Sequence, residues 1–254
     1  MANTVILQSF TFGCLFTISI IFVFGMVLHL TVQPVQALPT LHPFTSTPYN
    51  ATMSDWLARY WNWSLSIPTS EHPRNDLTGN NCGINQNGPV WFLDPPVGEG
   101  STTRTNTCNI PEGKTIFVPL LVSECGYRFD VDVRTVDALE GCVKPGNNHG
   151  NIKFDVDGKP LLIIKDSGEK DYETSQRILS NIFTAYYPTS NNIVGDNGTG
   201  FDTKMADGYF AMIKPLPAGD HTIKLDVQVI PQPTNYHTSM TYNLKIGGNS
   251  TTQS

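Results

Sequence analysis

Two stretches decide the fold, HTIKLDVQVI at residues 221–230 and MTYNLKI at residues 240–246. In both stretches, apolar side chains alternate with polar ones. A period of two is typical of a β-strand that has one buried face and one face in water. The stretches therefore predict two strands of a sheet that covers a core with one face.

Further short apolar runs follow turn residues along the chain. They are residues 89–93, 115–122, 151–156, 161–164 and 209–213. Asp157-Gly158 lies between two of them and predicts a tight hairpin, because such a turn needs positive φ at both central residues. Residues 178–187 predict one more strand. Together the runs predict a mainly β protein with a single β-sandwich, jelly-roll or immunoglobulin-like, over residues 56–247.

One or two short helices should accompany the strands. A helix of about three turns is expected between the capping residues Thr52 and Asp55 and the stop at Pro68. Its apolar residues recur at helical spacing over a wide arc, so the helix should pack on a sheet. They are Trp56, Leu57, Tyr60, Trp61, Trp63, Leu65 and Ile67. Residues 135–144 predict a second short helix.

Composition limits the partners. The chain has 254 residues with 22 acidic and 16 basic side chains, and its formal net charge is −6 at pH 7. Nucleic acids and anionic membrane surfaces bind clustered positive charge, so neither is expected as a partner. The length is sufficient for the core of one domain.

The N-terminal region predicts export. Residues 1–54 carry no Asp, Glu, Lys or Arg, and residues 11–32 form an apolar run long enough to span a bilayer. Small residues before Leu38 fit a cleavage site. Residues 1–37 are therefore expected to be a signal peptide or an uncleaved signal anchor, which would contact a membrane through residues 11–32. Residues 38–55 are expected to be a linker, and residues 248–254 a flexible tail.

Four cysteines follow this region, Cys82, Cys108, Cys125 and Cys142. An even number in an exported chain favours two disulfides. Three connectivities are open, and the sequential one closes the shortest loops. A zinc site is the competing interpretation, although no C-x-x-C pair is present.

Four sequons suggest a glycoprotein. Their asparagines are Asn50, Asn62, Asn197 and Asn249. Such short motifs also arise by chance, so each asparagine can equally be an unmodified polar residue.

Two tryptophans, Trp63 and Trp91, are candidates for a carbohydrate platform, because indole rings suit sugar faces. Core packing is the alternative for both. The acidic residues Glu124, Asp130 and Asp132 are candidate Ca²⁺ ligands, since calcium takes hard oxygen ligands. The alternative there is an acidic edge in water, and no other metal or cofactor is expected.

The chain contains no G-x-S-x-G, H-E-x-x-H, phosphate-loop or dinucleotide-binding motif. This favours a protein that is not an enzyme. A hydrolase that uses two carboxylates, drawn from Glu112, Glu124, Asp130 and Asp132, is the alternative. A structural surface subunit that assembles through sheet edges is a third hypothesis.

Several segments resemble a group of exported prokaryotic proteins. They are WNWSLSIP at 61–68, GPVWFL at 88–93, IPEGK at 110–114, ADGY at 206–209 and PLPAGDHTI at 215–223. The resemblance implies one domain and a secreted location, and it carries no activity or functional residue with it.

These observations together predict an exported protein of the cell envelope or the extracellular space, secreted or anchored at the cell surface. We expect it to act as a binding or surface-interaction module. Its ligand would be a carbohydrate or another surface protein.

Overall fold

The computed structural model describes residues 38–95, 100–128, 130, 132–145, 149–174, 176–188, 191–195, 198–229 and 236–247. Some expectations fall outside these ranges, namely the signal or anchor at 1–37, the tail at 248–254, and the sequons at Asn197 and Asn249. No helix within the ranges is long and apolar enough to cross a membrane. The described residues, from Leu38 to Gly247, cluster as one unit.

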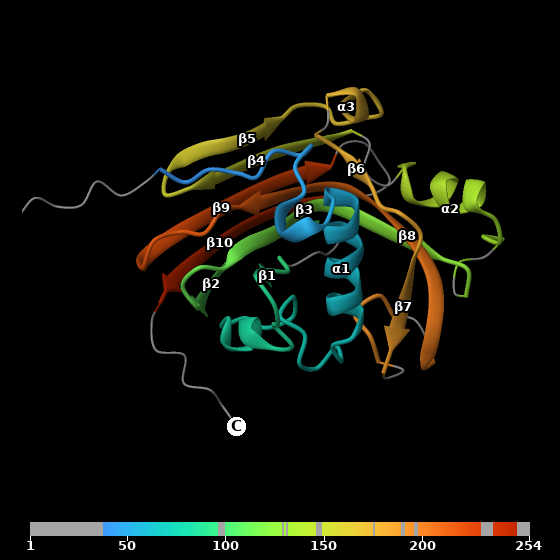
Figure 1. Cartoon of the computed structure of the whole chain (residues 1–254), viewed down its shortest axis with the longest axis horizontal. Coiled ribbons are helices and arrows are strands. Elements are labelled where there is room, and N and C mark those ends of the chain that lie inside the picture. Colours follow the sequence, from blue (N-terminus) through green and yellow to red (C-terminus); the bar gives the residue numbers. More distant parts are fainter. Residues whose placement is uncertain are drawn as a thin grey trace, which may run out of the picture. The chain divides into compact units, whose positions relative to one another are not determined.

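The elements follow one another as short helices and strands (Figure 1). They are η1 (Pro48–Asn50), α1 (Met53–Leu65), η2 (Asn80–Gly83), β1 (Val90–Phe92), β2 (Gly100–Ile110), β3 (Thr115–Gly126), α2 (Val136–Val143), β4 (Gly150–Val156), β5 (Lys159–Ile164), α3 (Lys170–Glu173), β6 (Ile178–Leu179), β7 (Phe183–Tyr187), β8 (Gly200–Ile213), β9 (Gly219–Val229) and β10 (Tyr236–Ile246).

The strands form two mixed sheets. The inner sheet has the order β1-β3-β8-β6, and β7 also pairs with β8. The outer sheet has the order β2-β10-β9-β4-β5. The pairs β1–β3 and β2–β10 are parallel, whereas the other pairs are antiparallel. The protein is therefore mainly β, as its sequence predicts.

The outer sheet buries one face. β9 and β10 pair along their whole length, and their buried residues alternate with more exposed ones. The apolar side chains Ile223, Leu225 and Tyr242 share a core with Val118 and Tyr209 of the inner sheet. The two sheets thus pack face to face in a sandwich-like arrangement, and the alternation predicted for β9 and β10 is confirmed.

The inner sheet buries both faces. Its second face packs against α1, where Tyr60 stacks on Phe117 at 5.3 Å and Phe117 stacks on Phe210 at 4.5 Å between ring centroids. All residues of β8 from Lys204 to Ile213 are buried as a result. A strand with two covered faces has no need of alternating polarity.

α1 begins as predicted. The side chain of Thr52 accepts the amide N–H of Asp55 at 3.1 Å, and the Asp55 carboxylate accepts the amide N–H of Thr52 at 2.9 Å. This reciprocal capping box satisfies backbone donors that the first turn leaves unpaired. The predicted second helix is α2.

β2 was not predicted from the sequence. Its residues are mostly Ser, Thr, Asn and Arg, which give no alternation of polar and apolar side chains. The strand nevertheless pairs with β10 from Gly100 to Ile110 in parallel register. Asn106, Cys108 and Ile110 are buried, and the long-range pairing supplies what the local pattern lacks.

The linker prediction for residues 38–55 needs a correction, because the segment packs on the domain. The amide of His42 donates to the carbonyl of Met212 at 2.8 Å, and Leu41 forms an isolated antiparallel bridge with Ile213. The Phe44 ring lies 5.9 Å from that of Phe210. The Pro/Thr/Ser composition predicted a linker, but apolar side chains placed between these residues anchor the segment on β8.

Candidate functional site

The four cysteines form two disulfides, Cys82–Cys108 and Cys125–Cys142. The first joins η2 to β2, and the second joins β3 to α2. This is the sequential pairing that closes the shortest loops. Disulfides persist in oxidising compartments, so both bridges fit an extracytoplasmic environment.

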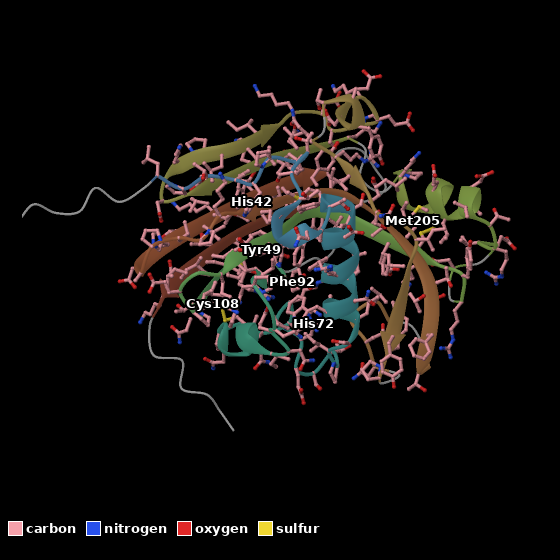
Figure 2. The ribbon with its side chains drawn as sticks, in the orientation of Figure 1. His42, Tyr49, His72, Phe92, Cys108 and Met205 are labelled. Carbon is pink, nitrogen blue, oxygen red and sulfur yellow. A yellow bond between two sulfur atoms is a disulfide. The ribbon has the colours of Figure 1, made fainter. Side chains whose placement is uncertain are left out.

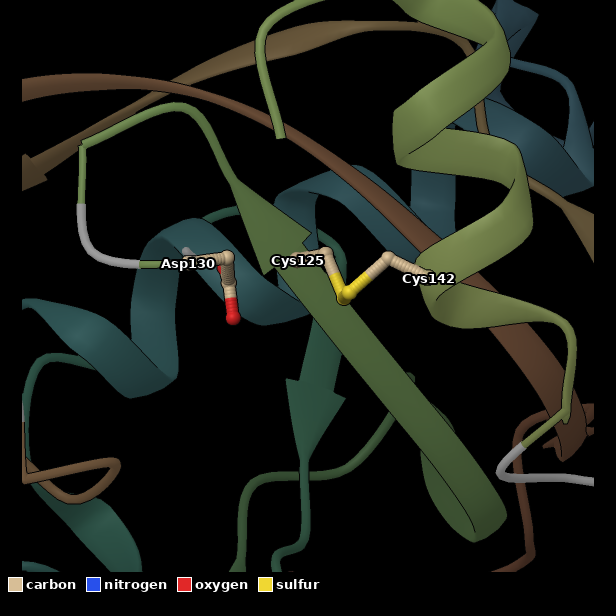
Figure 3. Close-up of side chains that lie close together, drawn as sticks. All are labelled: Cys125, Asp130 and Cys142. Carbon is tan, nitrogen blue, oxygen red and sulfur yellow. A yellow bond between two sulfur atoms is a disulfide. The ribbon is translucent and has the colours of Figure 1, made fainter. Parts of the chain in front are cut away.

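The predicted calcium ligands do not converge within the described ranges. The carboxylate of Glu124 pairs with the ammonium of Lys204 at 2.5 Å, and the carboxylate of Asp130 accepts the amide N–H of Gly126 at 2.6 Å. One cluster of three residues that could ligate a metal is found in this part of the chain, Cys125, Asp130 and Cys142. Its two sulfurs are bonded to each other (Figure 3), so it offers a single carboxylate rather than a calcium site.

Neither candidate tryptophan presents a face to solvent. Trp63 is 7% exposed, its ring stacks on Phe92 at 5.5 Å, and its indole N–H donates to the carbonyl of Ile84 at 3.0 Å. Trp91 is 8% exposed and belongs to the core between the two sheets, with Cys108. The structure therefore does not support a sugar platform built from these two rings, and core packing describes both.

Two of the four sequon asparagines lie within the described ranges. Asn50 is exposed at the end of η1, where its φ is 59°. Asn62 is half-buried on α1, and the hydroxyl-bearing residue of its sequon, Ser64, is fully buried.

An open groove of about 640 Å³ lies beside α1. The polar side of the helix forms one wall through Arg59, Asn62 and Ser66, and residues 85–89 form the opposite wall. Trp56, Trp63 and Phe92 also line it. Figure 1 shows the segment before β1 lying beside α1.

Arg59 is the one charged side chain among the described residues that line the groove. Its guanidinium carbon lies 4.5 Å from the centre of the Trp56 ring. A cation over an indole face is held by the ring quadrupole, which reduces the freedom of the long side chain. The groove therefore combines a positioned positive charge with the neutral amides of Asn62, Asn85 and Asn87.

Gln86 fixes the wall opposite α1. Its side-chain oxygen accepts the amide N–H of Phe92 at 3.0 Å, and its side-chain nitrogen donates to the carbonyl of Phe92 at 2.7 Å and to that of Cys82 at 3.1 Å. The glutamine thus occupies the hydrogen-bonding positions that a neighbouring strand would use. It therefore blocks strand addition at this edge of β1.

A buried polar network joins the end of α1 to the segments around it. The Asp94 carboxylate accepts Nε of Arg74 at 3.0 Å, Nη2 of Arg74 at 3.2 Å and the hydroxyl of Ser64 at 3.1 Å. The same Nη2 donates to the hydroxyl of Tyr60 at 3.3 Å. Burial lowers the pKa of Arg74, but Asp94 and Tyr60 raise it by more, so the guanidinium stays charged.

Ser64, His72 and Asp94 have the residue types of a catalytic triad, but their hydrogen bonds do not run from serine to histidine as in a triad. The amide N–H of Arg74 donates to Nδ1 of His72 at 3.1 Å, which leaves the ring hydrogen on Nε2. Nε2 faces the Ser64 hydroxyl at 3.0 Å and therefore donates to it (Figure 2 labels His72).

The remaining bonds agree with a structural role. The Ser64 hydroxyl donates onward to Asp94, so it has no base to take its proton. Burial is the main cause that lowers the pKa of His72, which keeps the ring neutral. All three side chains are buried, and a substrate would not reach them.

The carboxylates proposed for a hydrolase also lie apart from the groove. Glu112 sits in an exposed turn between β2 and β3, and the described residues that line the groove include no Asp or Glu. Sequence reasoning missed the groove residues Arg59, Asn85 and Asn87. The helical period places Arg59 on the polar face of the helix, but nothing local shows that residues 85–89 face it.

A second surface feature was also missed. Tyr186 of β7 and Phe201 of β8 are both exposed and lie directly opposite each other, with ring centroids 5.0 Å apart. The strand prediction at 178–187 included Tyr186. Its partner could not be named, because the sequence did not predict that β8 begins at Gly200.

No protein-family model matches the chain, and no curated protein matches it. Two solved structures are similar to parts of it. One is PbICP-C in complex with falcipain-2, with a TM-score of 0.25 and 11% identity over 63% of this chain and 99% of that one. The other is the cysteine protease inhibitor EhICP2 from Entamoeba histolytica, with a TM-score of 0.22 and 16% identity over 62% of this chain and 95% of that one.

Likenesses at these TM-scores are too distant to carry an argument about fold or function. The fold and the groove therefore define the protein only as a mainly β, disulfide-bonded chain that fits an extracytoplasmic environment.

Proposed function

We propose that this protein is an extracytoplasmic binding module that takes an extended segment of a partner protein into the groove beside α1. The observation that carries the proposal is the groove itself, in which Arg59 is held over Trp56 and faces a wall of amide side chains. Among the described residues that line the groove there is no His, Cys, Lys, Asp or Glu, so none of them could serve as a general base to activate the Ser66 hydroxyl. A binding role therefore fits its residues better than a catalytic one.

The groove chemistry favours a polypeptide over a sugar. Sugars bind to open aromatic faces, and the rings of Trp56, Trp63 and Phe92 are buried. Amide side chains pair readily with the N–H and C=O groups of an extended peptide. Arg59 adds a fixed guanidinium that suits a carboxylate, so we propose that the bound segment contains Asp or Glu.

Other expectations from the sequence belong with this proposal. We propose that residues 1–37 direct export, that the resemblance to exported prokaryotic proteins reflects a shared location, and that the sandwich is of jelly-roll or immunoglobulin-like type. Glycosylation of the sequon asparagines is part of the same proposal.

The test is a binding assay with a panel of extended peptides that are acidic, neutral or basic, next to a panel of glycans. Tryptophan fluorescence is a suitable signal, because Trp56 and Trp63 line the groove. We expect saturable binding of acidic peptides. Loss of a charged hydrogen bond should weaken this binding by about tenfold or more in Arg59→Met, whose side chain still covers Trp56.

Lys224→Met is the matched control, because this lysine is exposed on the outer sheet away from α1. It removes the same charge and should leave affinity unchanged. Binding of a glycan without any peptide would contradict the proposal, and so would peptide binding that Arg59→Met does not alter. Association of the chain with itself at higher concentration, in place of ligand binding, would favour a structural subunit.

A further inference from the structure

Lys204 is a buried lysine in the middle of the inner sheet. It lies on β8 next to Met205 (labelled in Figure 2), and its side chain is 1% exposed. Its ammonium nitrogen lies 2.5 Å from Oε2 of Glu124 on β3 and 3.5 Å from Oδ2 of Asp202 on β8. The side chains of these two acids are 9% and 1% exposed.

The surroundings hold the three groups in place. The amide of Arg128 donates to Oδ1 of Asp202 at 3.0 Å. A Cβ added at Gly126 would lie 2.1 Å from Oδ2 of Asp202, so the carboxylate packs directly on the backbone of β3. Oδ2 has no hydrogen-bond partner among the atoms described, and its contact is the ammonium of Lys204. The ring of Tyr187 lies 5.5 Å from the same nitrogen.

The strand register brings Glu124 and Lys204 together. β3 and β8 are antiparallel, with Gly126 opposite Lys204 and Glu124 opposite Ala206. Glu124 and Lys204 are therefore diagonal neighbours on adjacent strands, a spacing that long side chains bridge. They are separated by 80 positions in the sequence.

The three charged groups are unfavourable to bury as ions, but their positions suit a reaction between them. Burying an ammonium with two carboxylates costs desolvation energy that a neutral amide would not. A nitrogen fixed against a carboxyl group reacts as if at very high local concentration. Exclusion of water also favours the loss of water.

We propose that Lys204 and Glu124 condense to an isopeptide bond between β3 and β8, with Asp202 as the proton carrier. This inference is independent of the groove and of the function proposed for it. Glu124 is the acyl partner because its carboxylate is nearest to the nitrogen and lies on the neighbouring strand. Asp202 is the carrier because its Oδ2 lies 3.5 Å from the same nitrogen and accepts no hydrogen bond from any described atom.

The step balances without any further reactant. The ammonium of Lys204 passes one proton to Asp202, and the nitrogen lone pair forms a bond to Cδ of Glu124. Asp202 delivers that proton to one oxygen of Glu124, and a second proton follows from nitrogen by the same route. The C–O bond then breaks with its electron pair, and that oxygen leaves as water. An ammonium and a carboxylate become a neutral amide and one water, and the Asp202 carboxylate is restored.

The test is mass spectrometry of the full chain, purified after export and reduced. We expect a mass lower than that of the same polypeptide by one water molecule. A tryptic digest should show no cleavage after Lys204 and should contain the peptide with Glu124 joined to the peptide with Lys204. A wild-type chain with its full mass and two separate peptides would overturn the proposal, and no variant is needed for this result.

One variant tests the role of Asp202, and the position of the bond tests that of Glu124. Asp202→Asn keeps the shape of the side chain but cannot carry the proton, so we expect the full mass and cleavage after Lys204. Asp226→Asn, on the exposed side of the outer sheet, is the control and should keep the bond. A bond that maps to Asp202 would refute Glu124 as the partner. Complete formation of the bond in Asp202→Asn would refute the role of Asp202 as proton carrier.

Discussion

Replacing Asp94 with alanine should destabilise the protein severely, because this carboxylate sits at the centre of the buried network at the end of α1. The side chain of Asp94 is 1% exposed and that of Arg74 is 9% exposed. Removal of the acid would leave a buried guanidinium that has lost two hydrogen bonds, at 3.0 and 3.2 Å. The hydroxyl of Ser64 would lose its acceptor as well.

The size of the effect follows from these contacts. Breaking a buried ion pair by removing one partner costs about 3–5 kcal/mol. This is a large part of the roughly 5–15 kcal/mol by which a domain is usually stable. Replacing both partners by apolar residues, as in Arg74→Met with Asp94→Leu, removes the unpaired charge. The double variant should therefore lose less free energy of unfolding than Asp94→Ala alone.

Urea unfolding followed by tryptophan fluorescence measures these free energies, and circular dichroism supplies a second probe of the same transition. Asp220→Ala on the exposed side of β9 is a control that should change stability by less than about 0.5 kcal/mol. A loss below about 1 kcal/mol in Asp94→Ala would refute the reasoning. The reasoning would also be refuted if the double variant lost as much free energy of unfolding as its two single variants, Arg74→Met and Asp94→Leu, lose together.

Three further predictions concern the fold. Burial lowers the pKa of His72 below its usual value of 6.5. Just below pH 6.5 the unfolded chain therefore binds a proton on this ring, whereas the folded chain does not. The free energy of unfolding should fall as the pH drops below 6.5, by up to about 1.4 kcal/mol per pH unit. Urea midpoints at several pH values measure this fall. It should be shallower in His72→Asn and unchanged in His149→Asn, the exposed control. Replacing Cys125 and Cys142 by serine removes a disulfide that closes a loop of 17 residues. The free energy of unfolding in urea should fall by about 3 kcal/mol, and no change would contradict a disulfide in the native state. Thr52→Ala should cost about 1 kcal/mol, measured in the same way, and Thr52→Ser should restore it.

Local features could be predicted because they depend on residues a few positions apart. The alternation of β9 and β10 follows from side chains that point to opposite faces. The reciprocal bonds of Thr52 and Asp55 join residues three apart. The turn at Asp157 and Gly158 has positive φ at both residues, 54° and 72°, as its sequence indicates.

The candidate site could be predicted only in part. The helical period placed Arg59 on the polar side of its helix, which is the side that lines the groove. It did not show whether Trp63 is buried or exposed, because a tryptophan at this position fits the helical period in either case. The opposite wall at residues 85–89 comes from a different segment, and the bonds of Gln86 to the backbone of Phe92 that fix it follow no local rule.

The sequence by itself determined that this chain forms sheets with a buried face and a capped helix, and that four cysteines follow residue 37. Only the tertiary structure decided which strands meet. It placed the polar strand β2 in parallel beside β10, covered β8 on both faces, and set Lys204 against Glu124 across 80 positions. The physical reason is that periodicity, turns and caps arise from near neighbours along the chain. Burial of a strand and pairing of charges depend instead on which distant segments exclude water from them.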